Sequence, residues 1–181
     1  DLRVSTKYEQ DFDKHIEENP FCIYYLGHVQ SPTSNIREFS TETSHPFNLK
    51  NKYLAHNGVL SNHNELIQEY NLNIECEVDS GVILPLIEKI GFTDAISTLQ
   101  GTFGCWYYDS NTGCLRIFRS GSTLFLNSGS FSSAQPETSH EKVNSLGYNY
   151  INEGHILEYN FTNNTFNKVD EFELNAAPFF L

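Results

Sequence analysis

The chain has 181 residues, of which 39% are hydrophobic and 14% aromatic, and its formal net charge is −12. An aromatic content this high excludes a disordered acidic tail, and the length predicts a single packed domain over residues 1–181. The negative charge argues against a nucleic-acid partner, because phosphates would be repelled over most of the surface. The sequence has no run of about 18 apolar residues, so we expect no membrane partner.

Short helices and one buried strand are expected in the first half of the chain. Residues 9–18 have helical spacing, residues 21–26 are aromatic and β-branched as in a buried strand, and residues 27–37 have the composition of a loop. Three further helices are expected, over residues 61–70, 79–90 and 93–99. Asn62 can cap the first of these three, and Pro85 should bend the second.

The second half of the chain predicts a run of antiparallel hairpins. Six strands are expected, over residues 103–109, 114–119, 123–127, 148–151, 155–161 and 166–173. Turn-forming residues separate most of them, as in Ser-Asn-Thr-Gly at 110–113 and Asn-Glu-Gly at 152–154. Earlier in the chain, a short strand over residues 53–56 runs into the turn dipeptide at residues 57–58. The elements together predict an α+β fold dominated by antiparallel sheet.

The cysteine and histidine spacings do not predict a metal site. The four cysteines form no Cys-x-x-Cys pair, and three of them sit among apolar or aromatic neighbours, as reduced core thiols do; they are Cys22, Cys76, Cys105 and Cys114. Reduced thiols favour a cytoplasmic location. A metal hydrolase is a weaker reading, because the five candidate ligands show no His-x-x-x-His or His-Glu-x-x-His spacing; they are His15, His28, His45, His56 and His63. We expect no metal and no cofactor.

The dipeptide Asn57-Gly58 carries a chemical interpretation as well as a structural one. At a turn, the side-chain amide of Asn57 and the backbone N–H of Gly58 would be two neutral donors beside each other, which is what an oxyanion hole needs. An Asn-Gly pair taken alone is more often a plain hairpin turn. The dipeptide therefore needs support from the sequence around it.

Six short motifs provide that support because of their order along the chain. They are Gly-His-Val-Gln-Ser-Pro-Thr at 27–33, Ser-His-Pro-Phe at 44–47, His-Asn-Gly-Val-Leu-Ser-Asn at 56–62, Asp-Ser-Gly-Val-Ile at 79–83, Leu-Gln-Gly-Thr-Phe at 99–103 and Arg-Ser-Gly-Ser-Thr-Leu at 119–124. The succession resembles the class II glutamine amidotransferase domain, a family of N-terminal-nucleophile hydrolases. Its motifs are G-H-x-R-x-x-T, H-P, H-N-G, D-[ST], L-x-G-x-[FY] and R-x-x-x-P-L.

The resemblance implies a fold, a reaction and a partner. The fold is a four-layer αββα sandwich of two antiparallel sheets. The reaction is the hydrolysis of glutamine to glutamate and ammonia through a γ-glutamyl thioester. The partner is an ammonia-accepting synthase, here expected as a separate subunit.

The resemblance also assigns roles to individual residues. Asn57 and the N–H of Gly58 correspond to the oxyanion hole, and Asp79 to the carboxylate that holds the α-amino group of glutamine. Thr33 lies in the loop for the α-carboxylate. His45 matches the histidine of the H-P motif near the pocket, although a structural hydrogen-bonding histidine is an equally good reading.

Two positions depart from the family pattern. Gln30 stands where the family has an arginine on the α-carboxylate; an amide brings no charge there, and the form Gly-His-x-Gln-x-Pro-Thr resembles phage-like members. The family nucleophile is an N-terminal cysteine with its own α-amino group as base, whereas residue 1 here is Asp1. Three explanations fit: a preceding segment, a processed or engineered fragment, or a natural pseudoenzyme that serves as a binding or regulatory module. The chain alone is predicted to be inactive, and we expect it to lack the N-terminal segment of the domain.

Overall fold

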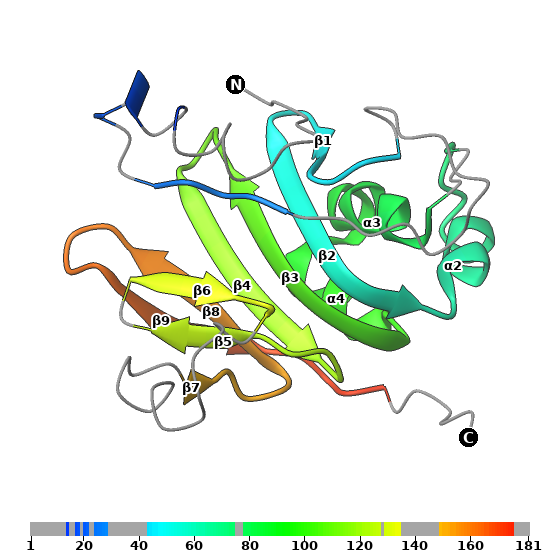
Figure 1. Cartoon of the computed structure of the whole chain (residues 1–181). Coiled ribbons are helices and arrows are strands. Elements are labelled where there is room, and N and C mark those ends of the chain that lie inside the picture. Colours follow the sequence, from blue (N-terminus) through cyan, green and yellow to red (C-terminus); the bar gives the residue numbers. More distant parts are fainter. Residues whose placement is uncertain are drawn as a thin grey trace.

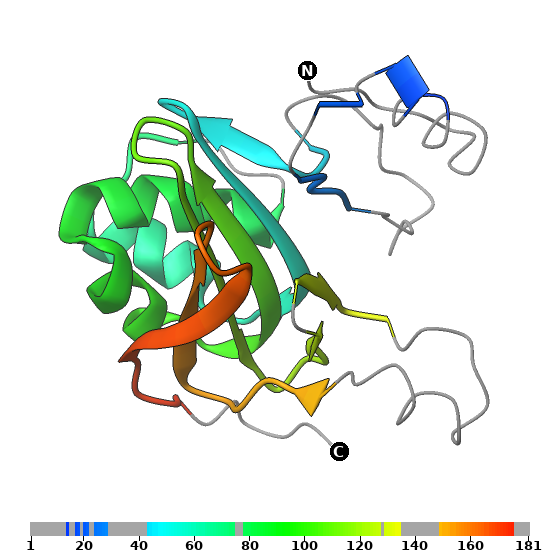
Figure 2. The same ribbon diagram turned by 90° about the vertical axis from the view of Figure 1, so that its left-hand side faces the viewer.

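The protein is built from two antiparallel sheets that pack face to face, with helices on the outer face of the larger sheet (Figures 1 and 2). The computed structural model describes residues 14, 17–18, 20–21, 24–28, 43–74, 78–127, 129–134 and 149–175. Two antiparallel sheets with few helices are the architecture that the motif order implies, so the expected fold class is confirmed.

The larger sheet has six strands in the order β1-β2-β3-β4-β8-β9. Their bounds are Phe47–Leu49, Lys52–Leu60, Gly101–Asp109, Cys114–Ser120, His155–Asn160 and Thr165–Glu171. The smaller sheet has the order β6-β5-β7, with bounds Ser130–Ser132, Phe125–Asn127 and Asn149–Tyr150. Lys14, Glu17 and Glu18 are helical, and the rest of the helix expected over residues 9–18 lies outside the described residues. Four helical elements are described after β2: α2 (His63–Glu69), the 3₁₀ helix η1 (Asp79–Val82), α3 (Ile83–Ile90) and α4 (Phe92–Thr98).

The alternation of side chains along the strands divides the core in two. Leu54 and Leu60 of β2 face the helices, where they join the larger apolar cluster with Phe103 and Phe118. Ala55, one residue out of phase, faces the smaller sheet and its own apolar cluster. In Figure 2, the helices and the smaller sheet accordingly lie on opposite sides of the larger sheet.

The structure corrects the turn that was expected at Asn57-Gly58. Strand β2 does not end at His56 but continues to Leu60, with Asn57 opposite Gly104 and Gly58 opposite Phe103 of β3. Strand pairing overrides the local turn preference, because all nine residues of β2 are paired with residues of β3. Gly58 adapts with a φ of +145°.

Several other expectations were also wrong in detail. Residues 24–28, which include the end of the expected buried strand, belong to no strand, and the side chain of Trp106 donates to the carbonyl of Gly27 instead. The strands β7 and β8 do not form a hairpin with each other: β7 pairs with β5 in the smaller sheet, and β8 pairs with β4 and β9. The side chain of Asn62 does not cap α2 but binds backbone groups of Thr98 and Gln100.

Other expectations are confirmed. The hairpins β3–β4 and β8–β9 form as predicted from their turn residues. The three helices of the middle segment are present, with Gly91 at the end of α3. Pro85, which was expected to bend its helix, falls instead in the first turn of α3, where its missing N–H leaves no helical bond unmade, so the ground for that expectation is removed. In the part of the chain that the structure describes, no helix is both long and apolar enough to span a membrane.

Candidate functional site

The predicted site residues gather around the second half of β2. Strand β1 pairs only with residues 52–54 of β2, so from Ala55 onward the edge of β2 opposite β3 carries no strand among the described residues. The bond from the N–H of Ser61 to the carbonyl of Gln100 fixes the phase of the β2–β3 ladder. By that phase, the N–H groups of Gly58 and Leu60 point away from β3 and toward the open edge.

Gly58 is required at its position for a steric reason. A Cβ atom there would lie 2.0 Å from the carbonyl oxygen of Thr102 and 2.9 Å from the hydroxyl of Ser122. Only a hydrogen fits between β2 and β3 at this point, and the φ of +145° is a backbone conformation that favours glycine. The glycine thus lets β2 stay paired while its own N–H remains at the open edge.

Asp79 lies at the same edge. It opens η1 after a short connection, and its Oδ2 accepts a 2.6 Å hydrogen bond from the N–H of Leu60. Its Oδ1 accepts a 2.9 Å bond from the N–H of Ser80. Two backbone donors therefore fix the carboxylate, and each oxygen keeps a lone pair for a further partner.

His56 and Ser80 form a buried polar group behind this carboxylate. The Nδ1 of His56 lies 2.8 Å from the hydroxyl of Ser80, and its Nε2 lies 3.2 Å from the carbonyl oxygen of Thr102. Both side chains are nearly inaccessible, with 3% and 2% of their surface exposed. Burial lowers the pKa of His56, although the carboxylate of Asp79 and the bond to Thr102 act in the opposite direction.

The structure brings two further histidines of the motifs to this place. The ring of His45 lies 4.3 Å from that of His28 and 6.4 Å from that of His56, centroid to centroid. Burial lowers the pKa of His28 as well. Nevertheless, no group of three or more His, Cys, Asp or Glu in the described part of the chain is arranged to hold a metal ion.

The structure does not show the side chains of the remaining predicted residues, Asn57, Gln30 and Thr33, together with Asp79 and the N–H of Gly58. Asn57 is exposed, and because it is one residue out of phase with His56, its side chain leaves β2 on the side of the smaller sheet. The amide must therefore turn over the strand edge to join the N–H of Gly58, and this pairing stays a prediction. Gln30 and Thr33 lie outside the described residues.

Sequence reasoning considered His56 only as a candidate metal ligand and did not single out Ser80 or Thr102, although a signal for the first two was present. His56 precedes Asn57 in the H-N-G motif, and Ser80 follows Asp79 in the D-[ST] motif. What was missing is the contact between the two motifs, which are 24 residues apart.

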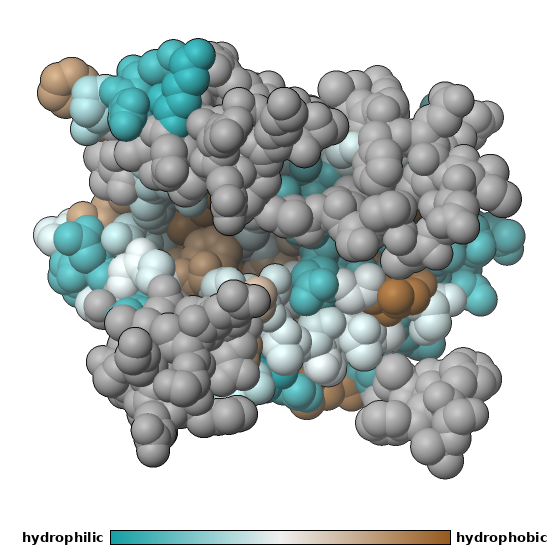
Figure 3. All heavy atoms as spheres, viewed as in Figure 1, coloured by the Kyte–Doolittle hydropathy of each residue, from teal (hydrophilic) through white to brown (hydrophobic). Residues whose placement is uncertain are grey.

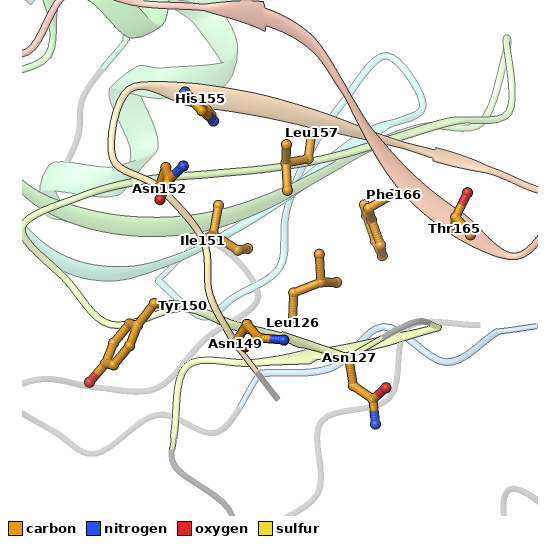
Figure 4. A pocket seen from close by; sticks show the side chains of 10 residues that line it. All are labelled: Leu126, Asn127, Asn149, Tyr150, Ile151, Asn152, His155, Leu157, Thr165 and Phe166. Carbon is orange, nitrogen blue, oxygen red and sulfur yellow. The ribbon is translucent and has the colours of Figure 1, made fainter. Parts of the chain in front are cut away.

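A separate pocket of about 390 Å³ lies between the smaller sheet and the β8–β9 hairpin. Figure 4 shows Leu126, Ile151 and Phe166 pointing into it and Tyr150 pointing away from it. None of the predicted site residues that the structure describes lines this pocket. Figure 3 shows apolar side chains in a recess on the face that carries the smaller sheet. The open edge of β2, where the described residues of the motifs gather, remains the better candidate site.

Comparison with known proteins agrees with the motif order. Residues 36–126, half of the chain, match the family model for the glutamine amidotransferase domain. Over 74 residues, the chain is 28% identical to 7-cyano-7-deazaguanine synthase 2 of Sulfurisphaera tokodaii, covering 41% of this chain and 16% of that protein. Over 96 residues, it is 27% identical to glutamine–fructose-6-phosphate aminotransferase (isomerizing) of Oceanobacillus iheyensis, covering 47% and 16%. The chain thus spans about one sixth of the length of these relatives.

Solved structures share the fold. The glutamine phosphoribosylpyrophosphate amidotransferase of B. subtilis, complexed with ADP and GMP, superposes with a TM-score of 0.57 at 18% identity, covering 82% of this chain and 35% of that one. A structure described as the allosteric regulatory enzyme of purine biosynthesis gives a TM-score of 0.54 at 20% identity, covering 75% and 32%. With half of its residues matched to the family model and its two-sheet fold shared with these structures, the chain belongs to the class II glutamine amidotransferase domain family.

Proposed function

We propose that this domain binds glutamine at the open edge of β2 and that the full protein hydrolyses its side-chain amide to glutamate and ammonia. The observation that supports this most directly is the position of Asp79. Its carboxylate is bound to the N–H of Leu60 at the edge toward which the N–H of Gly58 also points, two residues away. A fixed carboxylate suits the α-ammonium group of an amino acid, and a backbone N–H at the same edge suits the oxygen of a side-chain amide.

The spacing along β2 fits glutamine in length. Residues two apart in a strand are separated by about 6.6–6.8 Å. The α-nitrogen and the side-chain amide carbon of extended glutamine are four bonds apart, which is about 5 Å at ordinary bond lengths. With the ammonium group on Asp79, the amide carbonyl can therefore reach the N–H of Gly58.

Each site residue then has a role in the reaction. Asn57 and the N–H of Gly58 stabilise the tetrahedral oxyanion, at about 3 kcal/mol per donor as in other hydrolases. Asp79 holds the α-ammonium group, while Thr33 and Gln30 bind the α-carboxylate. His45 borders the glutamine site at the open edge of β2. Because Gln30 is neutral, the α-carboxylate is held by hydrogen bonds alone, which predicts a high KM for glutamine.

The nucleophile in this proposal is an N-terminal cysteine that forms a γ-glutamyl thioester. The amide nitrogen leaves as ammonia, and water then releases glutamate and regenerates the thiol. The four cysteines of the chain have no free α-amino group, so the proposal takes the nucleophile from outside these 181 residues. Burial also raises the pKa of Cys105, which keeps that thiol protonated and unreactive.

We also propose a partner for the ammonia. The two relatives carry the matched region as about one sixth of their length, and their names describe a synthase and an aminotransferase. We expect the ammonia to pass to a synthase active site on a separate subunit. A cytoplasmic location fits the free thiols of Cys105 and Cys114.

An alternative is a catalytically inactive member of the family that serves as a binding or regulatory module. The observation in its favour is Gln30, which removes the charge that the family uses on the α-carboxylate. Asp79 argues against it, because a scaffold has no need for a carboxylate fixed at an open strand edge.

The test is glutamate release from L-glutamine by the full-length protein. We expect Asn57→Ala to lower kcat about 100-fold or more, because it removes one oxyanion donor. Asn73→Ala makes the same change at another exposed asparagine, beyond α2, and should leave kcat unchanged. Normal turnover in Asn57→Ala would remove Asn57 from the mechanism. Glutamine binding without any turnover by the unmodified protein would favour the inactive module.

A further inference from the structure

The hydroxyl of Ser80 lies between two acceptors that compete for its hydrogen. Its Oγ is 2.8 Å from the Nδ1 of His56 and 3.3 Å from the Oδ1 of Asp79. A serine has a single O–H hydrogen, so it can donate fully to only one of them. The protonation state of His56 decides which one.

The carbonyl of Thr102 sets the tautomer of neutral His56. A carbonyl oxygen only accepts, so the Nε2 that lies 3.2 Å from it carries the hydrogen. The Nδ1 is then an acceptor and takes the hydrogen of Ser80. The distances agree, because 2.8 Å is an ordinary length for this bond, whereas the 3.3 Å to Asp79 is long for a hydroxyl donor.

Protonation of His56 reverses this arrangement. Both ring nitrogens become donors, so the Nδ1–H donates to the oxygen of Ser80. The hydroxyl hydrogen must leave that line and turn to the Oδ1 of Asp79. The carboxylate, already bound by two backbone N–H groups, gains a third donor and loses a lone pair that a ligand could use.

We propose that His56 and Ser80 form a proton-controlled relay that sets how strongly Asp79 binds the ammonium group of an α-amino acid. The role of Asp79 in this relay rests on the proposed function. His56 and Ser80 are positioning residues, since neither is placed to touch the substrate: both are buried behind the carboxylate. The site is open to the ammonium group when His56 is neutral and weakened when it is charged.

The groups around His56 set its pKa and therefore the pH at which the relay switches. Asp79 and the bond to the carbonyl of Thr102 favour the charged ring, while burial disfavours it; the neighbouring His28 has its own pKa lowered by burial and by the charge of His56. His45 lies 6.4 Å away, and Cys105 stands opposite on β3 with a thiol whose pKa is raised by burial. Burial is the largest of these effects, so the pKa of His56 lies below its ordinary value of 6.5 and the relay switches on the acid side of neutrality.

The first experiment measures the affinity of the full-length protein for L-glutamine by calorimetry from about pH 8 to about pH 5. Charged His56 repels the ammonium group equally with and without the hydroxyl, so the comparison with Ser80→Ala isolates the relay. We expect the unmodified protein to lose about tenfold more affinity on acidification than Ser80→Ala does. Ser80→Thr keeps a hydroxyl and should restore the difference. Ser97→Ala removes a hydroxyl that binds a backbone carbonyl within α4 and should behave as the unmodified protein. Equal pH dependence in Ser80→Ala and the unmodified protein would overturn the relay.

A second measurement does not depend on glutamine. Nitrogen-15 NMR of the imidazoles should show His56 as the Nε2–H tautomer at neutral pH, and the carboxyl carbon-13 signal of Asp79 should shift as His56 titrates, less so in Ser80→Ala. The Nδ1–H tautomer refutes the relay whatever glutamine does. If the protein binds no glutamine at any pH while both NMR results hold, the proposed function fails and the relay stands.

Discussion

Replacing Asp79 by Asn tests the geometry of the candidate site most directly. The two oxygens of Asp79 each accept one backbone hydrogen bond, from Leu60 at 2.6 Å and from Ser80 at 2.9 Å. An asparagine amide has one oxygen and one NH₂ group. Whichever way it turns, the NH₂ group faces a backbone N–H, so one of the two bonds must be lost.

The expected loss in the free energy of unfolding follows from the negative charge of the Asp79 carboxylate, which accepts both hydrogen bonds. A hydrogen bond to a charged group contributes about 1.5–3 kcal/mol, and the bond that remains becomes a weaker neutral one. Asp79 is partly exposed, and water compensates part of the loss. We expect Asp79→Asn to lower the free energy of unfolding by about 2–3 kcal/mol. The same change should weaken glutamine binding by about 10- to 150-fold, because the carboxylate is the partner of the ammonium group.

The assay is urea unfolding followed by circular dichroism, with Asp94→Asn as the matched control. Asp94 is exposed in the first turn of α4, where its charge contributes less than about 1 kcal/mol. If Asp79→Asn unfolds at the same urea concentration as the unmodified protein, the two backbone bonds do not hold Asp79 and the reasoning is refuted.

Three further predictions concern the surroundings of the site. Gly58→Ala should destabilise the protein by more than about 3 kcal/mol in thermal unfolding, because its Cβ would meet a carbonyl oxygen at 2.0 Å, whereas Gly113→Ala, with positive φ but open space, should lose only about 1 kcal/mol. Burial lowers the pKa of His28 and His56 below 6.5, so the unfolded chain binds more protons below that pH; the stabilisation is present above about pH 6.5 and is lost as the pH falls. Calorimetry should show Tm falling on acidification, and His28→Gln should reduce that slope. Asn62→Ala leaves two backbone groups without their side-chain partner and should lower the free energy of unfolding by about 2 kcal/mol in urea.

The parts of the fold that follow from local signals could be predicted from the sequence. The β3–β4 hairpin forms where four turn residues separate two apolar strands, and α3 ends where Gly91 follows an apolar helical face. The prediction of a turn at Asn57-Gly58 was wrong because a dipeptide preference cannot reveal that partner residues 45 and 47 positions further along the chain are available to continue the ladder. The pairing of β7 was wrong for the same reason.

For the candidate site too, the sequence identified residues but not the contacts between them. The motifs identify Asp79 as a residue of interest, but they do not show that its carboxylate rests on the backbone of Leu60. They also give no indication that His56 and Ser80 meet, since that contact exists only once the helices have packed on β2. Residue identities come from the sequence, and the direction in which each donor points requires the fold.

The chain contains a single tryptophan, and its placement provides a spectroscopic reporter. Trp106 is buried between the sheets, and its indole N–H donates a 3.1 Å hydrogen bond to the carbonyl of Gly27, next to His28. Fluorescence emission from this one indole depends on the polarity around it. Breaking the bond to Gly27 should therefore shift the emission to longer wavelength, so that this one indole reports on the Gly27-His28 segment without labels.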